Sequence, residues 1–163
     1  MTGVQTCALP ILEIIVDDLT GPEIAEFIEE HIEEMKAVTP SPESKHALDL
    51  DGLRVPEVTF WTMIEDGEIL GCGAIKLLGH DHAEIKSMRV APTHRQRGLA
   101  STLLRHIIAE SRRMGISRLS LETGSFAFSE PARRLYLKHG FELCGPFGDY
   151  EADPNSAFMT RIL

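Results

Sequence analysis

The feature that most constrains this 163-residue chain is a short turn that joins a β-strand pattern to a long helix pattern. The turn is Arg95-Gln96-Arg97-Gly98-Leu99-Ala100, and apolar residues repeat at helical spacing from Gly98 to Met114. The first turn of a helix carries unpaired main-chain N–H groups and the positive end of the helix dipole, which together attract phosphate oxygens. Gly98 permits close approach of a ligand, and Arg95 and Arg97 add cationic partners. The turn therefore predicts a site for a polyphosphate.

Two common nucleotide-binding turns do not fit this sequence. A Walker P-loop needs Gly-x-x-x-x-Gly-Lys-Ser/Thr, and a dinucleotide fold needs Gly-x-Gly-x-x-Gly. Here the turn holds one glycine, Gly98, and Ala100 keeps the first turn of the helix narrow. Both of those protein classes are excluded for this turn.

Strand and helix patterns mix along the rest of the chain. Three segments have helical spacing: a helix from Pro22 that ends at Thr39-Pro40, the helix from Gly98 to Met114, and a short helix from Glu130 to His139. The β-rich runs predict strands at Leu12–Val16, Val58–Glu65, Glu68–Leu78, His82–Val90, Arg118–Thr123, Phe141–Pro146 and Ala157–Leu163. Because no repeat and no second core separates these elements, the pattern predicts one α+β domain over residues 12–163.

Local signals refine these elements. Thr20 and Glu23 have the spacing of a capping box at the start of the first helix. Asp66-Gly67 predicts a tight hairpin between two antiparallel strands. Gly71 and Gly73 interrupt the second of those strands, which indicates a bulge or a close approach of two backbones.

Charge is divided unequally along the chain. Residues 1–82 contain 17 Asp and Glu against 4 Lys and Arg, whereas residues 83–163 contain 8 against 12. The acidic balance argues against nucleic acid as a partner, and it favours a cationic small molecule. No apolar run is long enough to cross a membrane, and the three cysteines have neither C-x-x-C spacing nor an even number. We therefore expect a cytoplasmic protein with no membrane partner, as a monomer or a homodimer.

The first eleven residues differ in sequence pattern from the rest of the chain. Met1 to Ile11 has no helical or strand periodicity, and Thr2 to Ile11 resembles the conceptual translation of a sequencing-library adapter. The segment is interpreted as a non-native artefact, with a short natural arm as the alternative, so the native N-terminus stays open. It is left out of the fold prediction.

Two motifs carry a resemblance to a known family. Arg95-x-x-Gly98-x-Ala100, which follows Met88-Arg89-Val90-Ala91-Pro92, resembles the signature of the GNAT superfamily of acetyl-CoA-dependent N-acetyltransferases. The segment from Ala132 to Phe141 resembles the second motif of that family. Element order resembles the family from residue 12 to residue 163. The segments Glu84–Arg89 and Gly145–Tyr150 resemble a bacterial subgroup.

The resemblance implies the GNAT fold and its cofactor cleft. In that fold a mixed, mostly antiparallel sheet of six to seven strands is flanked by about four helices. The strand that matches Ala83–Val90 splays away from the one that matches Arg118–Thr123, and acetyl-CoA lies in the gap. Its pyrophosphate would lie on the main-chain N–H groups of Arg97 to Ala100, and its pantetheine would pair with Met88 and Val90 like an added strand.

The resemblance also assigns residues to the cofactor. These are Met88, Arg89, Val90, Arg95, Gln96, Arg97, Gly98, Leu99, Ala100, Ser101, Ser129 and Tyr136. Ser129 departs from the family, because many relatives carry Asn at this position. A serine hydroxyl is expected to cap the short helix and to donate a hydrogen bond over a shorter reach.

The implied reaction is attack of a neutral amine on the acetyl thioester. The N–H group of Met88 is the family's candidate donor to the oxyanion, and Tyr136 is the candidate acid for the leaving thiolate. Periodicity alone favours Tyr136 as a packed core residue, and only the family resemblance favours a catalytic role. Glu84 is the favoured base, with Glu122 as its rival and an ion pair to Lys86 or Arg89 as the structural alternative. We expect Glu84, Glu122 and Thr123 to contact the acceptor.

Two further groups are not assigned to chemistry. His80-Asp81-His82 has no additional ligand at metal spacing, so we expect no metal site there. Cys144 has no His partner that the sequence places beside it, so we expect a buried, inert cysteine.

Together these features predict an acetyl-CoA-dependent N-acetyltransferase that acts on a primary amine, by direct attack in a ternary complex. The acidic first half favours a small cationic amine, and protein N-termini or lysines remain open as acceptors. The alternatives are a regulatory module that binds acyl-CoA without turnover, and an acyltransferase that uses a longer acyl group.

Overall fold

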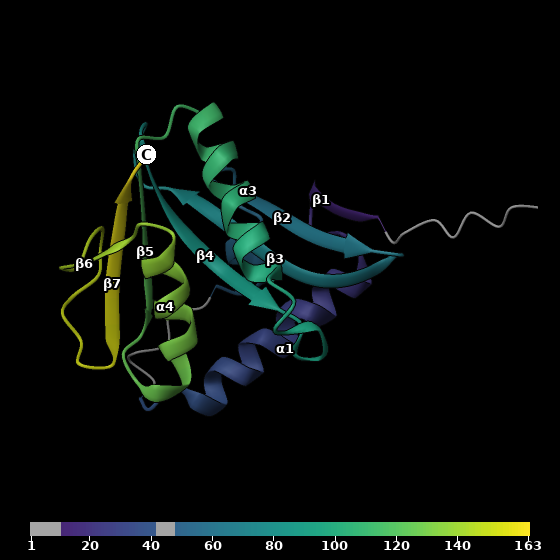
Figure 1. Cartoon of the computed structure of the whole chain (residues 1–163), viewed down its shortest axis with the longest axis horizontal. Helices are drawn as coiled ribbons and strands as arrows, with labels where there is room; N and C mark the ends of the chain where they lie inside the picture. The colour runs from purple at the N-terminus through teal and green to yellow at the C-terminus, as the bar shows by residue number, and fades with distance from the viewer. Residues whose placement is uncertain (1–10, 42–47) are drawn as a thin grey trace, which may run out of the picture.

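The computed structural model describes residues 11–41 and 48–163, and its centre is one seven-stranded sheet (Figure 1). The strand order is β1-β2-β3-β4-β5-β7-β6, and each neighbouring pair is antiparallel except β4 and β5, which are parallel. The strands are β1 Leu12–Val16, β2 Val58–Glu65, β3 Glu68–Leu77, β4 His82–Val90, β5 Arg118–Gly124, β6 Glu142–Cys144 and β7 Ser156–Ile162. The mixed, mostly antiparallel α+β architecture predicted from the sequence is confirmed.

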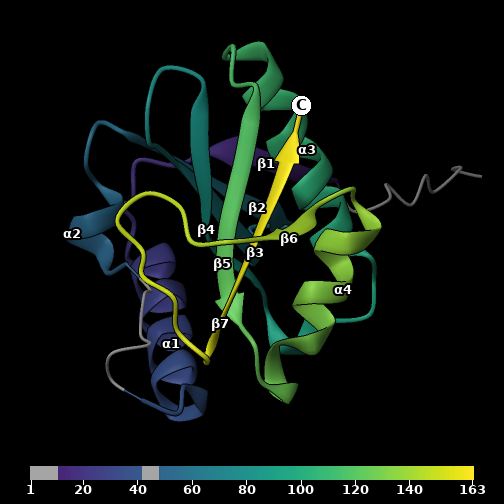
Figure 2. The same ribbon diagram turned by 90° about the vertical axis from the view of Figure 1, so that its left-hand side faces the viewer.

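Helices cover both faces of the sheet, as Figure 2 shows with α1 and α2 on the left and α3 and α4 on the right. The helices are α1 Pro22–Val38, α2 Leu50–Leu53, α3 Leu99–Arg113 and α4 Glu130–Lys138. One buried cluster packs α3 and Tyr136 of α4 against β2 to β5, and a second packs α1 and α2 against the opposite face of β2 and β3. Alternate residues of β2 serve the two clusters, since Phe60 belongs to one and Trp61 to the other.

The long elements match the sequence patterns, whereas two local expectations are wrong and one short helix was not expected. The N-cap of α1 is Gly21, with no side-chain cap, because the Thr20 hydroxyl donates to Asp18 Oδ1 at 2.7 Å and so is not available to a capping box. The short helix α2 was not predicted; Asp49 caps it by accepting from the N–H group of Gly52. The strand expected over Phe141–Pro146 is limited to Glu142–Cys144.

The hairpin and the bulge were both indicated by glycines. Asp66 and Gly67 have φ angles of 50° and 77°, which is the left-handed geometry of the tight turn that joins β2 to β3. Between β3 and β4 the register shifts opposite Gly73, so that Ser87 and Met88 face one residue, and Ser87 has φ 56°. A Cβ atom on Gly73 would lie 2.6 Å from Met88 Sδ, so the bulge depends on the absence of a side chain there.

The strands β4 and β5 part soon after they meet. They are paired only over His82–Glu84 and Arg118–Ser120, and Figure 1 shows them diverging from that end of the sheet. From Ile85 onward β4 therefore has no strand partner on its β5 side. The splay that the resemblance implied is present, and it opens between α1 and α4.

Among the described residues, no helix is both long and apolar enough to cross a bilayer.

Candidate active site

A cavity of about 420 Å³ lies where β4 and β5 part. Its walls come from the C-terminal half of α1, from β4, from the end of β5 and from the first turn of α4. Nine of the predicted site residues line it: Glu84, Met88, Arg89, Val90, Arg95, Glu122, Thr123, Ser129 and Tyr136. Ser129 is the last residue of the short 3-10 segment η3, Ala127–Ser129. Residues from distant parts of the chain are thus brought to one cleft.

The predicted phosphate turn lies next to Arg95, at the N-terminus of α3. Gln96 and Gly98 have φ angles of 68° and 74°, so the backbone passes twice through the left-handed region before the helix begins. Within residues 11–41 and 48–163, the main-chain N–H groups of Arg97, Gly98, Leu99 and Ala100 donate to no other residue. A Cβ atom built on Gly98 meets nothing within 4 Å. The N–H groups are therefore neither occupied nor covered by the chain.

The two arginine side chains of this turn are paired with glutamates. Arg97 Nη2 lies 3.0 Å from Glu65 Oε2, and Arg97 Nη1 lies 3.1 Å from His94 Nδ1. Arg95 Nη2 lies 3.1 Å from Glu34 Oε1 of α1. Of these residues, Arg95 and Glu34 line the cavity.

Leu99 and Ser101 can serve a ligand only in restricted ways. The Leu99 side chain is buried in the core, so its main-chain N–H group is what it offers. The Ser101 hydroxyl lies 3.0 Å from His139 Nε2 and thereby connects α3 to the end of α4.

Tyr136 belongs both to the core and to the cavity. Its ring packs edge-on against Phe141 with centroids 5.6 Å apart, and the residue is 6% exposed. Burial raises the pKa of the Tyr136 phenol well above its ordinary value. Tyr136 therefore keeps its proton at neutral pH while it lines the cavity.

Glu84 is held in a compact polar cluster with Lys86 and Tyr150. Glu84 Oε1 lies 2.9 Å from Lys86 Nζ and accepts a hydrogen bond from the Tyr150 hydroxyl at 2.5 Å, and Lys86 also donates to that hydroxyl at 3.0 Å. The Glu84 and Lys86 side chains are both buried. The ion pair with Lys86, which was the structural alternative for Glu84, is present.

Glu122 lies on β5, across the gap from this cluster. Burial raises the pKa of the Glu122 carboxyl to about 7, against a smaller lowering effect of Lys86. On α1, burial together with Arg89 lowers the pKa of His31 to about 4, so its imidazole is neutral at pH 7. Both residues line the cavity.

A second cavity, of about 780 Å³, adjoins the first. It lies under the segment from Gly148 to Asn155, and Lys76 and Leu78 form part of its wall. Glu84, Lys86 and Asn155 line both cavities, so these three residues stand where the two spaces meet. An arrangement of two chambers with a shared wall suits a reaction between two bound molecules.

Two expectations about single residues are wrong. Ser129 occupies the N-cap position of α4 but makes no side-chain cap there; it is buried, and its hydroxyl Oγ would lie 2.5 Å from a Cβ atom on Gly124. Cys144 is exposed, because β6 is a sheet edge with little cover, whereas Cys72 is the buried cysteine and burial raises its pKa to about 12. Cys7 and the other residues of the N-terminal segment 1–10 lie outside the described residues.

The metal prediction is not contradicted. His82 Nε2 lies 2.7 Å from Ser120 Oγ, and the described residues contain no group of three His, Cys, Asp or Glu that is placed to hold a metal ion.

Sequence reasoning missed several cavity residues. Glu34, His31 and Phe126 line the cleft but sit in patterns that read as an amphipathic helix or as a loop. Tyr150 had a signal, since it ends the Gly145–Tyr150 segment that resembles a bacterial subgroup. Its contact with Glu84 joins positions 66 residues apart, which no local pattern reveals.

Comparison with known proteins identifies the family. Residues 24–141 match the model of the acetyltransferase (GNAT) family. The chain is 51% identical over 152 residues to the uncharacterized N-acetyltransferase YsnE of Bacillus subtilis (strain 168), covering 93% of this chain and all of that protein.

Two solved structures share the fold. An acyl-CoA N-acyltransferase structure from Klebsiella pneumoniae has a TM-score of 0.74 at 27% identity, covering 94% of this chain and 98% of the other. A GNAT acetyltransferase of Elizabethkingia anophelis, solved with acetyl-CoA bound, has a TM-score of 0.68 at 19% identity, covering 93% and 98%.

These matches establish the class of protein. The chain belongs to the GNAT family and is an acyltransferase of the N-acetyltransferase type. Its fold is the acyl-CoA N-acyltransferase fold, with the splayed strands and the open helix N-terminus described above.

Proposed function

We propose that this protein transfers the acetyl group of acetyl-CoA to the primary amine of a small cationic molecule, by direct attack within a ternary complex. The observation that carries the proposal is the pair of cavities that meet at Glu84, Lys86 and Asn155. Arg95 lines one cavity, and it begins the turn whose free N–H groups at the start of α3 suit the phosphates of the donor. The other is left for the acceptor.

The residues present fit acetyl-CoA. The N–H groups of Arg97 to Ala100 are unpaired within the described chain, and Arg95 extends the positive charge to the cavity. Beyond Glu84, β4 has no partner on its β5 side, so its backbone can accept an extended ligand at Met88 and Val90. When it is bound, acetyl-CoA supplies an activated thioester carbonyl.

Within this site we assign Met88 and Tyr136 the roles that the family resemblance implied. The N–H group of Met88, next to the bulge at Ser87, donates to the oxyanion. Tyr136, whose pKa is raised by burial, stays protonated and donates a proton to the leaving thiolate.

For the base, the contacts favour Glu122 over Glu84. Glu84 already neutralises buried Lys86 and accepts from Tyr150, so removing a proton from an amine would compete with both partners. Glu122 has a raised pKa of about 7, which is matched to general base catalysis near neutral pH. We propose that Glu122 accepts the amine proton, directly or through water, and that Glu84 and Thr123 help to form the acceptor site.

The acceptor chamber supports a cationic substrate. Its lining includes Asp149, Glu151 and Asp153 as well as Glu84, against the two lysines Lys76 and Lys86. An acidic excess around a cleft raises the local concentration of cations. We therefore propose a polyamine, an aminoglycoside-like compound or an amino-acid derivative as acceptor. Separately, we propose the cytoplasm as the place of action.

A thiol-release assay tests the function. Acetyl-CoA is incubated with the protein and a panel of polyamines, aminoglycosides, amino-acid derivatives and peptides with free N-termini, and free thiol is measured. We expect release with at least one small cationic amine. Binding of acetyl-CoA with no thiol release for any amine would contradict the proposal, and faster release from longer acyl-CoA would contradict the choice of acetyl group.

A further inference from the structure

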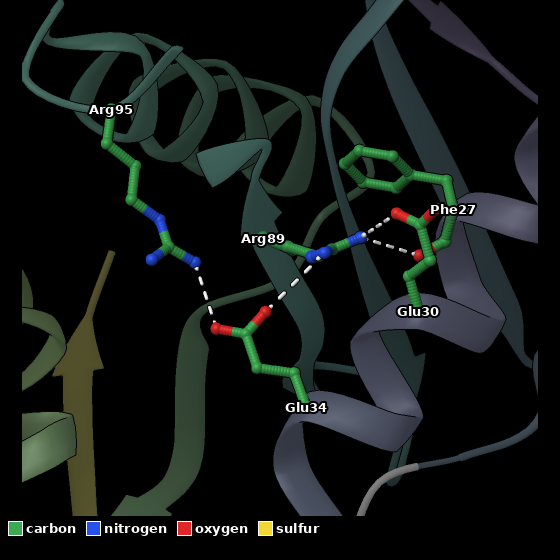
Figure 3. Close-up of polar contacts among 5 residues, drawn as sticks. All are labelled: Phe27, Glu30, Glu34, Arg89 and Arg95. Atoms are coloured by element: carbon green, nitrogen blue, oxygen red, sulfur yellow. Dashed lines mark hydrogen bonds and ion pairs between the residues drawn. The ribbon is translucent and has the colours of Figure 1, made fainter. Parts of the chain in front are cut away.

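A chain of contacts runs from the interior of the molecule to the mouth of the cofactor cavity (Figure 3). Arg89 of β4 is buried, with its side chain 5% exposed. Its Nη1 donates to the carbonyl oxygen of Phe27 at 2.8 Å, and its guanidinium lies 4.6 Å from the centroid of the Phe27 ring. These two contacts fix the guanidinium against α1.

Glu34 connects this fixed cation to the phosphate turn. Glu34 Oε2 lies 3.4 Å from Arg89 Nη2, and Glu34 Oε1 lies 3.1 Å from Arg95 Nη2 (Figure 3). One carboxylate of α1 thus bridges two arginines that lie 55 and 61 residues further along the chain. The Glu34 side chain is 26% exposed and that of Arg95 is 48% exposed, so burial decreases from Arg89 outward.

We propose that Glu34 is a positioning residue for acetyl-CoA: it holds the Arg95 guanidinium at the mouth of the cavity so that the remaining N–H groups face the incoming phosphates. This inference rests on the function proposed above. Glu34 touches no reacting atom and acts through Arg95.

The charge balance supports positioning over competition. Glu34 carries one negative charge between two positive ones, and Glu30, the other acid beside Arg89, is 58% exposed and 3.5 Å away. Because two arginines face the one Glu34 carboxylate, the group of Arg89, Glu34 and Arg95 carries a net positive charge toward a ligand.

The entropy of the Arg95 side chain points the same way. A free arginine side chain loses rotamer entropy when it is fixed in one geometry. With Glu34 in place, part of that loss occurs before the ligand arrives, which strengthens binding. Among the described residues, Glu34 is the polar partner that orients Arg95.

Calorimetric titration with acetyl-CoA, without amine, tests the inference in four variants. We expect Glu34→Gln to raise Kd about three- to fivefold, the range of a half-exposed ion pair. Arg95→Gln should raise Kd about tenfold. If Glu34 acts through Arg95, the double variant should bind as weakly as Arg95→Gln alone. Glu29→Gln, which removes the same charge from an exposed position of α1, is the matched control and should leave Kd unchanged.

A steady-state measurement separates positioning from general damage. In Glu34→Gln the KM for acetyl-CoA should rise while kcat at saturation changes less than twofold. The variant keeps one oxygen that can accept from Arg89, and a thermal melt verifies its folding. Arg95→Gln removes the same ion pair with Glu34 from the other side, and its half-exposed position makes damage to folding small.

The outcomes distinguish this inference from the proposed function. Tighter binding by Glu34→Gln would make Glu34 a competitor of the phosphates, and additive losses in the double variant would make it a structural residue; either result overturns the inference. Equal Kd values for Glu34→Gln and Glu29→Gln would also overturn it, with the function intact. No binding of acetyl-CoA by the unaltered protein would instead overturn the function.

Discussion

At the scale of single residues, Tyr136 shows how a core position can also be a site position. Its ring packs in the main buried cluster, as the helical periodicity predicted, while the residue lines the cofactor cavity. Burial keeps the phenol protonated, and a protonated phenol beside a thioester has a chemical use. The structural and the catalytic interpretations are therefore compatible.

Replacing Tyr136 by Phe separates them. The ring contact with Phe141 is retained, so we expect little change in stability or in acetyl-CoA affinity. Loss of the proton donor should lower kcat by about 10²-fold. Calorimetry measures the affinity for acetyl-CoA, and thiol-release kinetics measure kcat. If affinity falls as much as kcat, Tyr136 has a packing role and not a catalytic one.

The role proposed for Glu122 predicts how kcat/KM depends on pH. A base acts in its ionised form, so with a pKa of about 7 the value of kcat/KM should fall as pH drops below 7, by about tenfold per pH unit. In Glu122→Gln the acid limb near pH 7 should disappear and the plateau should fall by about 10²-fold. The matched variant is Glu84→Gln, which removes a neighbouring carboxylate and should keep the limb. If Glu122→Gln keeps the fall of kcat/KM below pH 7, another residue is the base.

At the scale of elements, the start of α3 combines an unusual backbone with unused donors. Gly98 has φ 74°, and the space beyond its Cα is open, so the requirement for glycine comes from the backbone angle and not from crowding within the chain. Sequence reasoning named this glycine for the close approach of a ligand, which stays a prediction. The positive φ was not predicted, because it belongs to a loop geometry that also includes Gln96.

Gly98→Val tests this element. A β-branched residue at that angle is strained by about 1–2 kcal/mol, and relief of the strain would rotate the N–H groups of the turn. We expect the Kd for acetyl-CoA to rise about tenfold or more. Gly79→Val, in an open turn with nothing within 4 Å of its Cβ position and no positive φ, should leave Kd unchanged. Unaltered affinity of Gly98→Val for acetyl-CoA would contradict the proposal that the phosphates bind at this turn.

At the scale of the whole molecule, periodicity predicted the elements and could not predict the distant contacts. Strands such as β4 were found residue for residue, because a run of β-formers stopped by Pro92 is a local signal. The Arg95, Glu34 and Arg89 network was not found, since its side chains come from α1, β4 and a loop. Side chains such as Tyr150 also need the tertiary structure, because what they touch lies across the sheet.

The same limit explains the errors. Thr20 has the right spacing for a cap, but Asp18 competes for its hydroxyl at two residues' distance. Cys144 was expected to be buried because cysteines usually are, yet its position on a short edge strand exposes it. In each case the neighbour that decides the outcome is visible only in the folded chain.

The early parting of β4 and β5 also bears on association with other chains in solution. Open strand edges at the rim of a sheet invite pairing with neighbouring molecules and hence aggregation. Here the unpaired stretch of β4 lines the cavity between α1 and α4, in the middle of the sheet, whereas the outer edges of the sheet are β1 and β6. The fold thus offers unpaired backbone groups of β4 to a ligand without placing them at an outer edge of the sheet.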